Sequence, residues 1–183
     1  KLLNEIDRGR QGLNHGISMK LPKLESIIDG VTRETYTLIL SNSGAGKTSF
    51  ALYAYVYRPL MEHLDDDDFK VLYFSLEMGE VALYIKLLSI YIFETYGIQL
   101  SFKKILSREK EYILSDEHYD LVKQCMPWID KISKKLEIYD KKVTPKKVYA
   151  ILKTRLEEMG TFSESETRLV YTPNNPNLIY NVV

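Results

Sequence analysis

The stretch that decides the fold is TYTLILSNSGAGKT, residues 35–48. Its first six residues, 35–40, are β-branched, aromatic or aliphatic, which is typical of a buried strand. Small residues follow over 41–46, and apolar side chains then recur at helical spacing over 47–64. We therefore predict a strand, a glycine-containing loop and a helix in direct succession, an arrangement in which a loop can bind phosphate.

The loop matches a phosphate-binding pattern at all but its first position. The pattern is G-x-x-x-x-G-K-[ST], and residues 41–48 read SNSGAGKT, with Ser41 in place of the first glycine. Glycines let the backbone turn its N–H groups inward, the ammonium of Lys47 can reach the β- and γ-phosphates, and the hydroxyl of Thr48 can ligate Mg²⁺. We predict a nucleotide site made of Ser43, Gly44, Ala45, Gly46, Lys47, Thr48 and Ser49. The alternative is a chance lysine after a glycine-rich loop, but the flanking strand and helix favour nucleotide binding.

A carboxylate follows the next predicted strand. Residues 70–75 form a second apolar run, and Glu77 lies just beyond it. The carboxyl ends of parallel strands meet at one edge of a sheet, so we expect Glu77 on the side of the phosphate loop. There it can polarise a water for attack on the γ-phosphate. Alternatively, Glu77 caps the helix that begins near Gly79, where the helix dipole favours negative charge; the residues alone leave both open.

The rest of the chain continues an alternation of strands and helices. A short amphipathic helix is predicted over 2–8 and a polar loop over 161–177. Beyond these, the patterns predict helices at about 80–96, 101–110, 116–135 and 145–159, and strands at 136–139 and 178–183. This order predicts an α/β fold, a mostly parallel sheet flanked by helices.

Composition excludes several classes of protein. The 183 residues carry 25 basic and 25 acidic side chains, so the chain has no bulk charge typical of a nucleic-acid or membrane binder. A lone cysteine, Cys125, excludes an internal disulfide and indicates a reducing compartment. No apolar run approaches the ~20 residues that a membrane span needs. We therefore expect a soluble, cytoplasmic domain without a membrane segment.

The basic residues are unevenly distributed. Residues 101–155 hold fourteen basic against eight acidic side chains, including lysine doublets at 103–104, 134–135, 141–142 and 146–147. Clustered lysines are typical of surfaces that bind nucleic-acid phosphates. The alternative is solvated helix faces. No aromatic residues interleave the doublets to stack on bases, so we favour solvated faces.

Three stretches resemble one family of ATPases. The sequence YFSLEM at 73–78 is similar to the "SLEM" element of DnaB-type replicative DNA helicases, within the RecA-like ATPase superfamily. Residues 16–30 resemble the segment that precedes the family's phosphate-loop strand. Residues 136–144 resemble the strand, the Asp and the start of the Thr-capped helix that precede the family's Walker B strand. The resemblance covers about residues 13–183, and the long helical elaboration at about 80–135 is similar to that of phage-encoded members.

The resemblance implies a motor of DNA replication. Its fold would be a RecA-like P-loop core spanning 13–183, preceded by a linker arm at 1–12. Lys47 would bind the phosphates of ATP, and Thr48 would ligate Mg²⁺. Glu77 would be the catalytic base. The catalytic residues that the resemblance implies are therefore Glu77 and Lys47. The implied partners are single-stranded DNA, met mostly through parts outside this chain, and further copies in a homo-hexamer.

The last predicted strand lacks the acidic residue of a Walker B strand. Residues 178–183 are apolar enough for such a strand, but Asn181 is neutral and lies in its middle. We expect the chain to stop shortly before that Asp, so that the core is incomplete at its C-terminal end; the alternative is an unrelated terminal strand. On this expectation the isolated chain binds nucleotide weakly and hydrolyses almost none.

Two other functions remain open at this point. One is a RecA-like recombinase or clock-type ATPase that forms rings or filaments without unwinding DNA. The other is a nucleotide-binding interaction module that has lost catalysis. A P-loop core serves many functions, so the fold alone does not choose between them.

Overall fold

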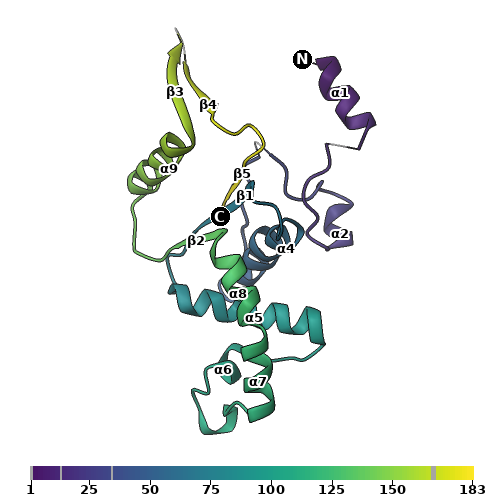
Figure 1. Cartoon of the computed structure of the whole chain (residues 1–183), viewed down its shortest axis with the longest axis vertical. Coiled ribbons are helices and arrows are strands. Elements are labelled where there is room, and N and C mark those ends of the chain that lie inside the picture. Colours follow the sequence, from purple (N-terminus) through teal and green to yellow (C-terminus); the bar gives the residue numbers. More distant parts are fainter. Residues whose placement is uncertain (1, 13, 34, 166–167) are drawn as a thin grey trace.

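The computed structural model describes residues 2–12, 14–33, 35–165 and 168–183, which form an α/β fold. A parallel sheet is flanked by helices, and a separate two-stranded hairpin lies beside it (Figure 1). The helices are α1 (Leu2–Arg10), α2 (Pro22–Glu25), α3 (Lys47–Ala51), the π-helical η1 (Leu52–Tyr57), α4 (Arg58–Glu62), α5 (Glu80–Tyr96), α6 (Phe102–Ile105), the 3₁₀ turn η2 (Lys110–Tyr112), α7 (Asp116–Gln124), α8 (Met126–Ser133) and α9 (Pro145–Met159). The strands are β1 (Phe69–Phe74), β2 (Leu136–Tyr139), β3 (Gly160–Ser165), β4 (Arg168–Pro173) and β5 (Ile179–Val182).

The sheet has β1 at its centre, in the order β2-β1-β5. Both neighbours run parallel to β1, with Val71 opposite Leu136 and Phe69 opposite Ile179. The three strands predicted at 70–75, 136–139 and 178–183 are thereby confirmed, as is a parallel sheet flanked by helices. All three strands end at one edge, where the N–H of Phe74 donates to the carbonyl of Val183 (2.8 Å).

The strand predicted first, over residues 35–40, is not formed. The segment is irregular, and Tyr36, Leu38 and Leu40 are 88, 64 and 81% exposed. Strand-forming side chains are not enough, because a strand also needs a neighbour for its backbone N–H and C=O groups. Within the described residues no backbone hydrogen bond joins this segment to the sheet, which therefore has three strands and not the four predicted.

The core lies between one face of the sheet and the helices. Val71 and Tyr73 of β1 point into it with Leu136 of β2. Trp128 of α8 is buried and stacks on Tyr91 of α5 with ring centroids 4.1 Å apart, as expected of a large aromatic anchor. The other buried members of this cluster come from β1, η1, α4, α5 and α8: Phe69, Leu52, Val56, Tyr57, Leu60, Leu83, Leu87 and Ile132.

Helix α9 reaches the opposite face of the sheet. Glu137 of β2 points away from the main core, and the guanidinium of Arg155 donates to it (2.5 Å). The start of α9 is as its sequence predicts: the side chain of Thr144 accepts the N–H of Lys147, with Pro145 at the first helical position. The helices therefore lie on both sides of the sheet.

Three predictions about secondary structure are wrong in detail. The helix expected at 101–110 ends at Ile105 because the chain turns at Ser107, which has φ of 48°. The helix expected at 116–135 is divided at the buried Cys125 into α7 and α8. The polar loop expected at 161–177 contains the antiparallel hairpin β3–β4, in which Phe162 pairs with Tyr171 across the strands.

The two ends of the molecule are built differently. In Figure 1 the β3–β4 hairpin and α1 project at one end, and α6 and α7 lie at the other. A second small core of Leu88, Ile92, Leu100 and Cys125 holds this second end together. Among the described residues, no helix combines the length and the apolar character needed to cross a lipid bilayer.

Candidate functional site

The glycine-containing loop has the backbone that its sequence requires. Gly44 and Gly46 have φ of 78° and 88°, the left-handed region that residues with a Cβ enter only with strain. The ammonium of Lys47 bends back and donates to the carbonyls of Ser41 (2.9 Å) and Asn42 (3.0 Å). The loop and its lysine therefore form one closed unit at the start of a helix.

The remaining predicted loop residues are open to solvent. Ser43, Ala45 and Ser49 are exposed, and Thr48 is half-buried at the start of α3. In the described part of the chain the hydroxyl of Thr48 has no hydrogen-bond partner. This hydroxyl is thus free to act as a ligand.

The helix that follows the loop is continuous but changes its winding. Helices α3, η1 and α4 run without a break from Lys47 to Glu62, and the central π-helical turn widens the backbone. Here Asn181 of β5 donates from its side-chain nitrogen to the carbonyl of Tyr55 (2.6 Å). Asn181 is therefore engaged in joining β5 to this helix.

Glu77 lies in a short loop that leaves the carboxyl end of β1. The hydroxyl of the buried Ser75 donates to the carbonyl of Met78 (2.6 Å) and accepts its N–H (3.2 Å). The side chain of Met78 packs against the main core. Glu77 is exposed between these two anchors, and its charge adds to the burial that raises the pKa of Tyr73.

Glu77 does not cap helix α5. The first N–H of that helix, on Glu80, donates instead to a carboxylate oxygen of Asp140 (3.1 Å). Asp140 follows β2 directly, 60 residues along the chain. From the sequence, this Asp is predicted only as part of a family resemblance. The signal that could have linked Asp140 to the Glu77 loop is that each follows a strand, because parallel strands that are neighbours end side by side.

The glycine-containing loop and Glu77 are not bonded to each other. Within the described residues no hydrogen bond or ion pair joins 41–49 to Glu77. The segment 35–40, which leads into the loop, is exposed and lies outside the sheet. That the loop and Glu77 form one site therefore stays a prediction.

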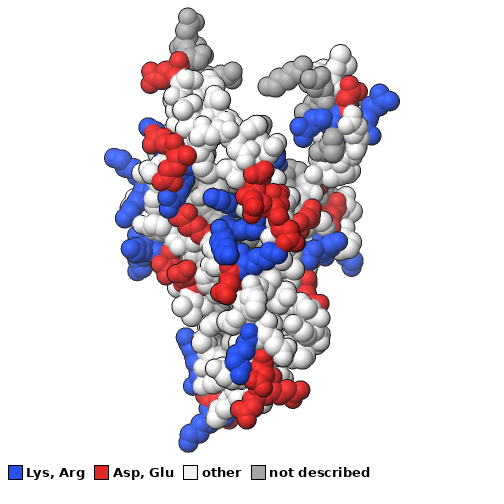
Figure 2. Space-filling view, in the orientation of Figure 1, with Lys and Arg blue, Asp and Glu red and all other residues white. Residues whose placement is uncertain are grey.

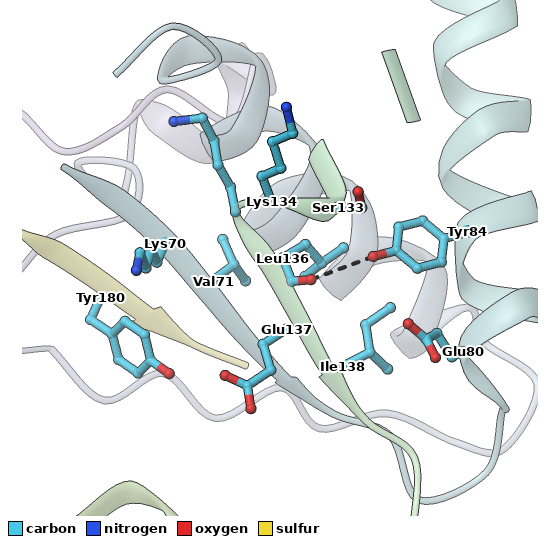
Figure 3. A pocket seen from close by; sticks show the side chains of 11 residues that line it. Lys70, Val71, Glu80, Tyr84, Ser133, Lys134, Leu136, Glu137, Ile138 and Tyr180 are labelled. Atoms are coloured by element: carbon cyan, nitrogen blue, oxygen red, sulfur yellow. Dashed lines mark hydrogen bonds between the residues drawn. The ribbon is translucent and has the colours of Figure 1, made fainter. Parts of the chain in front are cut away.

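An open cavity lies along β2, and its lining includes Glu80 at the start of α5. Its volume is about 390 Å³, and it is lined by side chains of α5, β1, β2 and β5 (Figure 3). Tyr84 of α5 donates from its hydroxyl to the carbonyl of Leu136 (3.4 Å) at its wall. None of the described residues that line this cavity belongs to the glycine-containing loop.

Charged side chains are mixed on the surface. On the face drawn in Figure 2, basic and acidic side chains alternate and do not separate into one basic area. Among the lysine doublets, Lys103 pairs with Glu109 (3.0 Å) and Lys135 donates to the carbonyl of Asp66. The doublets 141–142 and 146–147 are exposed and form no ion pair with any described residue.

The acidic run at 65–68 is bonded and not only solvated. Asp66 accepts the N–H of Asp68 (2.9 Å) and contacts Nδ1 of His63 (3.0 Å), which lowers its pKa. Asn175 donates to Asp68 (2.7 Å). Over the described ranges no group of three or more His, Cys, Asp or Glu side chains is arranged to hold a metal ion.

Comparison with known proteins gives no relatives for this chain. No family model, no curated protein and no solved structure matches it.

Proposed function

We propose that this chain is the ATP-binding part of a RecA-like motor that couples ATP hydrolysis to movement along single-stranded DNA, as in a replicative helicase. The observation that carries the proposal is the loop at 41–48. Two glycines take the left-handed backbone there, and Lys47 folds onto the loop carbonyls at the start of a helix. A glycine-containing loop with a lysine at a helix start is a common way to bind a phosphate group, which supports the proposal.

The residues of the loop suit a nucleotide with Mg²⁺. The ammonium of Lys47 would exchange its two carbonyl acceptors for phosphate oxygens, which are stronger acceptors because they are charged. Bound Mg²⁺ would neutralise charge on the phosphates, and we assign the hydroxyl of Thr48 to hold it. Ser43, Gly44, Gly46 and Ser49 would contribute backbone N–H groups. Ala45 would do so by exchanging its bond to the carbonyl of Asn42 (3.3 Å) for a phosphate oxygen.

Glu77 is the residue that we assign to the chemical step. Its carboxylate is exposed on an anchored loop, so it would orient a water and accept its proton as that water attacks the γ-phosphate. For this the loop at 41–48 has to approach the carboxyl edge of β1. Ordering of 35–40 as a strand would bring it there.

The test is ATP turnover of the full-length protein, measured with and without single-stranded DNA. We expect DNA to stimulate turnover, and Glu77→Gln to lower kcat by about 100-fold or more while leaving ATP binding within about twofold. Glu111→Gln is the matched control, because Glu111 is an exposed carboxylate in η2. ATP turnover that is changed neither by DNA nor by Glu77→Gln would contradict the proposal that the chain belongs to a motor.

A second candidate is a nucleotide-binding interaction module without catalysis. It is favoured by one observation: among the described residues no hydrogen bond or ion pair joins Glu77 to the loop at 41–49. Such a module would bind ATP through Lys47 and show no turnover with or without DNA. A RecA-like ATPase that does not unwind DNA would differ from this module because it shows ATP turnover. An assay of forked-duplex unwinding would distinguish such an ATPase from a helicase.

A further inference from the structure

We propose that Asp140 is a positioning residue that holds the Glu77 loop in place by capping helix α5. The inference rests on the proposed function, because it assigns a partner to the catalytic base of that function. Its structural part, the cap itself, is testable without any assumption about catalysis.

The cap is a contact between two distant parts of the chain. Helix α5 begins at Glu80, and its N-cap residue, Gly79, has no side chain to accept a hydrogen bond. Asp140 supplies the acceptor from the end of β2, with Oδ2 3.1 Å from the N–H of Glu80. A carboxylate at this position also interacts favourably with the dipole of a 17-residue helix.

The Glu77 loop is short and is held at both ends. At its start, Ser75 bonds to both the N–H and the carbonyl of Met78. At its end, Gly79 lies beside Asp140, with the position of a Cβ on Gly79 3.6 Å from Oδ2. Glu77 lies between these anchors, so the cap and the Ser75 bonds together set where its carboxylate can point.

Helix α5 and β2 are joined at a second place. The hydroxyl of Tyr84, one turn into α5, donates to the carbonyl of Leu136 at the start of β2 (3.4 Å) (Figure 3). Figure 3 also shows Glu80 on the side of α5 that faces Ile138 of β2. Two contacts therefore fix the first turns of α5 against β2, and Asp140 is the one next to the Glu77 loop.

Substitutions at Asp140 separate its roles. Asp140→Ala removes the acceptor, so the first turn of α5 and the residues before it gain freedom. Asp140→Asn keeps an oxygen that can accept from Glu80 and loses only the charge. A misplaced catalytic group lowers the rate of the chemical step more than it lowers ground-state binding. Rescue by Asn therefore identifies the hydrogen bond as the feature that matters.

The matched control is Ser115→Ala. Ser115 caps α7 by accepting the N–H of His118 (3.3 Å), at the end of the molecule where α6 and α7 lie (Figure 1). The substitution Ser115→Ala also removes a side-chain acceptor at a helix start, although a local one, so it reports what a lost cap does to the protein in general.

The experiment has two readouts on the full-length protein. Hydrogen exchange at the amide of Glu80 should accelerate about tenfold in Asp140→Ala, and by less than about threefold in Asp140→Asn and Ser115→Ala. In the ATPase assay, Asp140→Ala should lower kcat about tenfold with KM for ATP within twofold, Asp140→Asn should recover most of kcat, and Ser115→Ala should change neither.

The outcomes are distinct from those of the proposed function. If Glu77→Gln lowers kcat but Asp140→Ala does not, the positioning role is wrong and the motor stands. Unchanged exchange at Glu80 in Asp140→Ala overturns the cap, whatever the turnover. If Glu77→Gln itself has no effect on kcat, the proposed base fails and the positioning role fails with it, even where exchange at Glu80 confirms the cap.

Discussion

Two apolar segments of similar composition differ in structure: one is a paired strand and the other is irregular. Residues 35–40 and β1 (Phe69–Phe74) both combine aromatic and aliphatic or β-branched residues, and each precedes residues assigned to ATP chemistry. Leu72 of β1 is 0% exposed, whereas Leu38 is 64% exposed. Their side chains do not explain the difference, because both segments have strand-forming residues.

The difference lies in what each segment has beside it. β1 has a parallel neighbour on each side, and a bonded turn at 65–68 leads into it. Segment 35–40 has no strand partner among the described residues. Apolar composition thus makes a strand possible, and pairing decides whether it forms. Glu77 follows the paired segment and lies in a bonded loop, whereas the glycine-containing loop at 41–48 follows the unpaired segment.

The largest expected effect comes from shortening the same side chain in both segments. Leu72→Ala should lower the free energy of unfolding by about 2–5 kcal/mol, because it leaves a cavity in the packed interior. Leu38→Ala should change it by less than about 0.5 kcal/mol, since Leu38 packs on little. Urea unfolding measures both. Equal losses would show that 35–40 is packed like β1 in solution.

A second prediction compares two glycines. Gly46→Ala and Gly97→Ala each place a Cβ on a left-handed residue, with φ of 88° and 69°, and each should cost about 1 kcal/mol of stability. Only Gly46→Ala should also weaken binding of Mg·ATP, because Gly97 ends α5 outside the loop. Titration calorimetry measures the affinity. Equal affinities of the two variants would remove Gly46 from the site.

The third and smallest effect concerns the turn that leads into β1. The N–H of Asp68 and the contact with His63 lower the pKa of Asp66 below 3.8 in the folded state. A carboxyl group whose pKa is lower in the folded state than in the unfolded state stabilises the fold at pH values above its unfolded-state pKa. That stabilisation is lost as the pH falls through its folded-state pKa. Asp66→Asn should therefore be less stable than the wild type at pH 7 and equally stable well below pH 3.8.

The control for this pH dependence is Asp67→Asn, which alters an exposed carboxylate in the same turn. Thermal unfolding across the pH range measures both variants. A difference between Asp66→Asn and the wild type that persists unchanged into strong acid would contradict the role of its charge.

Much of the fold can be predicted from local patterns. The strands at 136–139 and 178–183, the helix at 80–96 and the Thr144-Pro145 start of α9 depend on periodicity, capping and chain punctuation, and the structure confirms them. The hairpin β3–β4 was not predicted, because the polar residues at 161–177 indicate a loop and Phe162 and Tyr171 lie apart in the sequence. That pair becomes visible only once the register is known.

The candidate site is less predictable, for a physical reason. The backbone of Gly44 and Gly46 and the reach of Lys47 are local properties, so the loop pattern suffices for them. The cap that Asp140 places on α5 joins residues 60 apart and depends on which strands are neighbours. Strand order is a long-range property that a single sequence does not state.

The most direct test of the account is the affinity of the chain for Mg·ATP, measured by titration calorimetry for the wild type and for Lys47→Ala. Lys110→Ala is the control, because Lys110 is an exposed lysine in η2. Charge-assisted hydrogen bonds contribute about 1.5–3 kcal/mol each, so Lys47→Ala should weaken binding by about tenfold or more and Lys110→Ala by less than about twofold. Absence of binding by the wild type, or equal affinity in Lys47→Ala, would contradict the assignment of this loop as a nucleotide site.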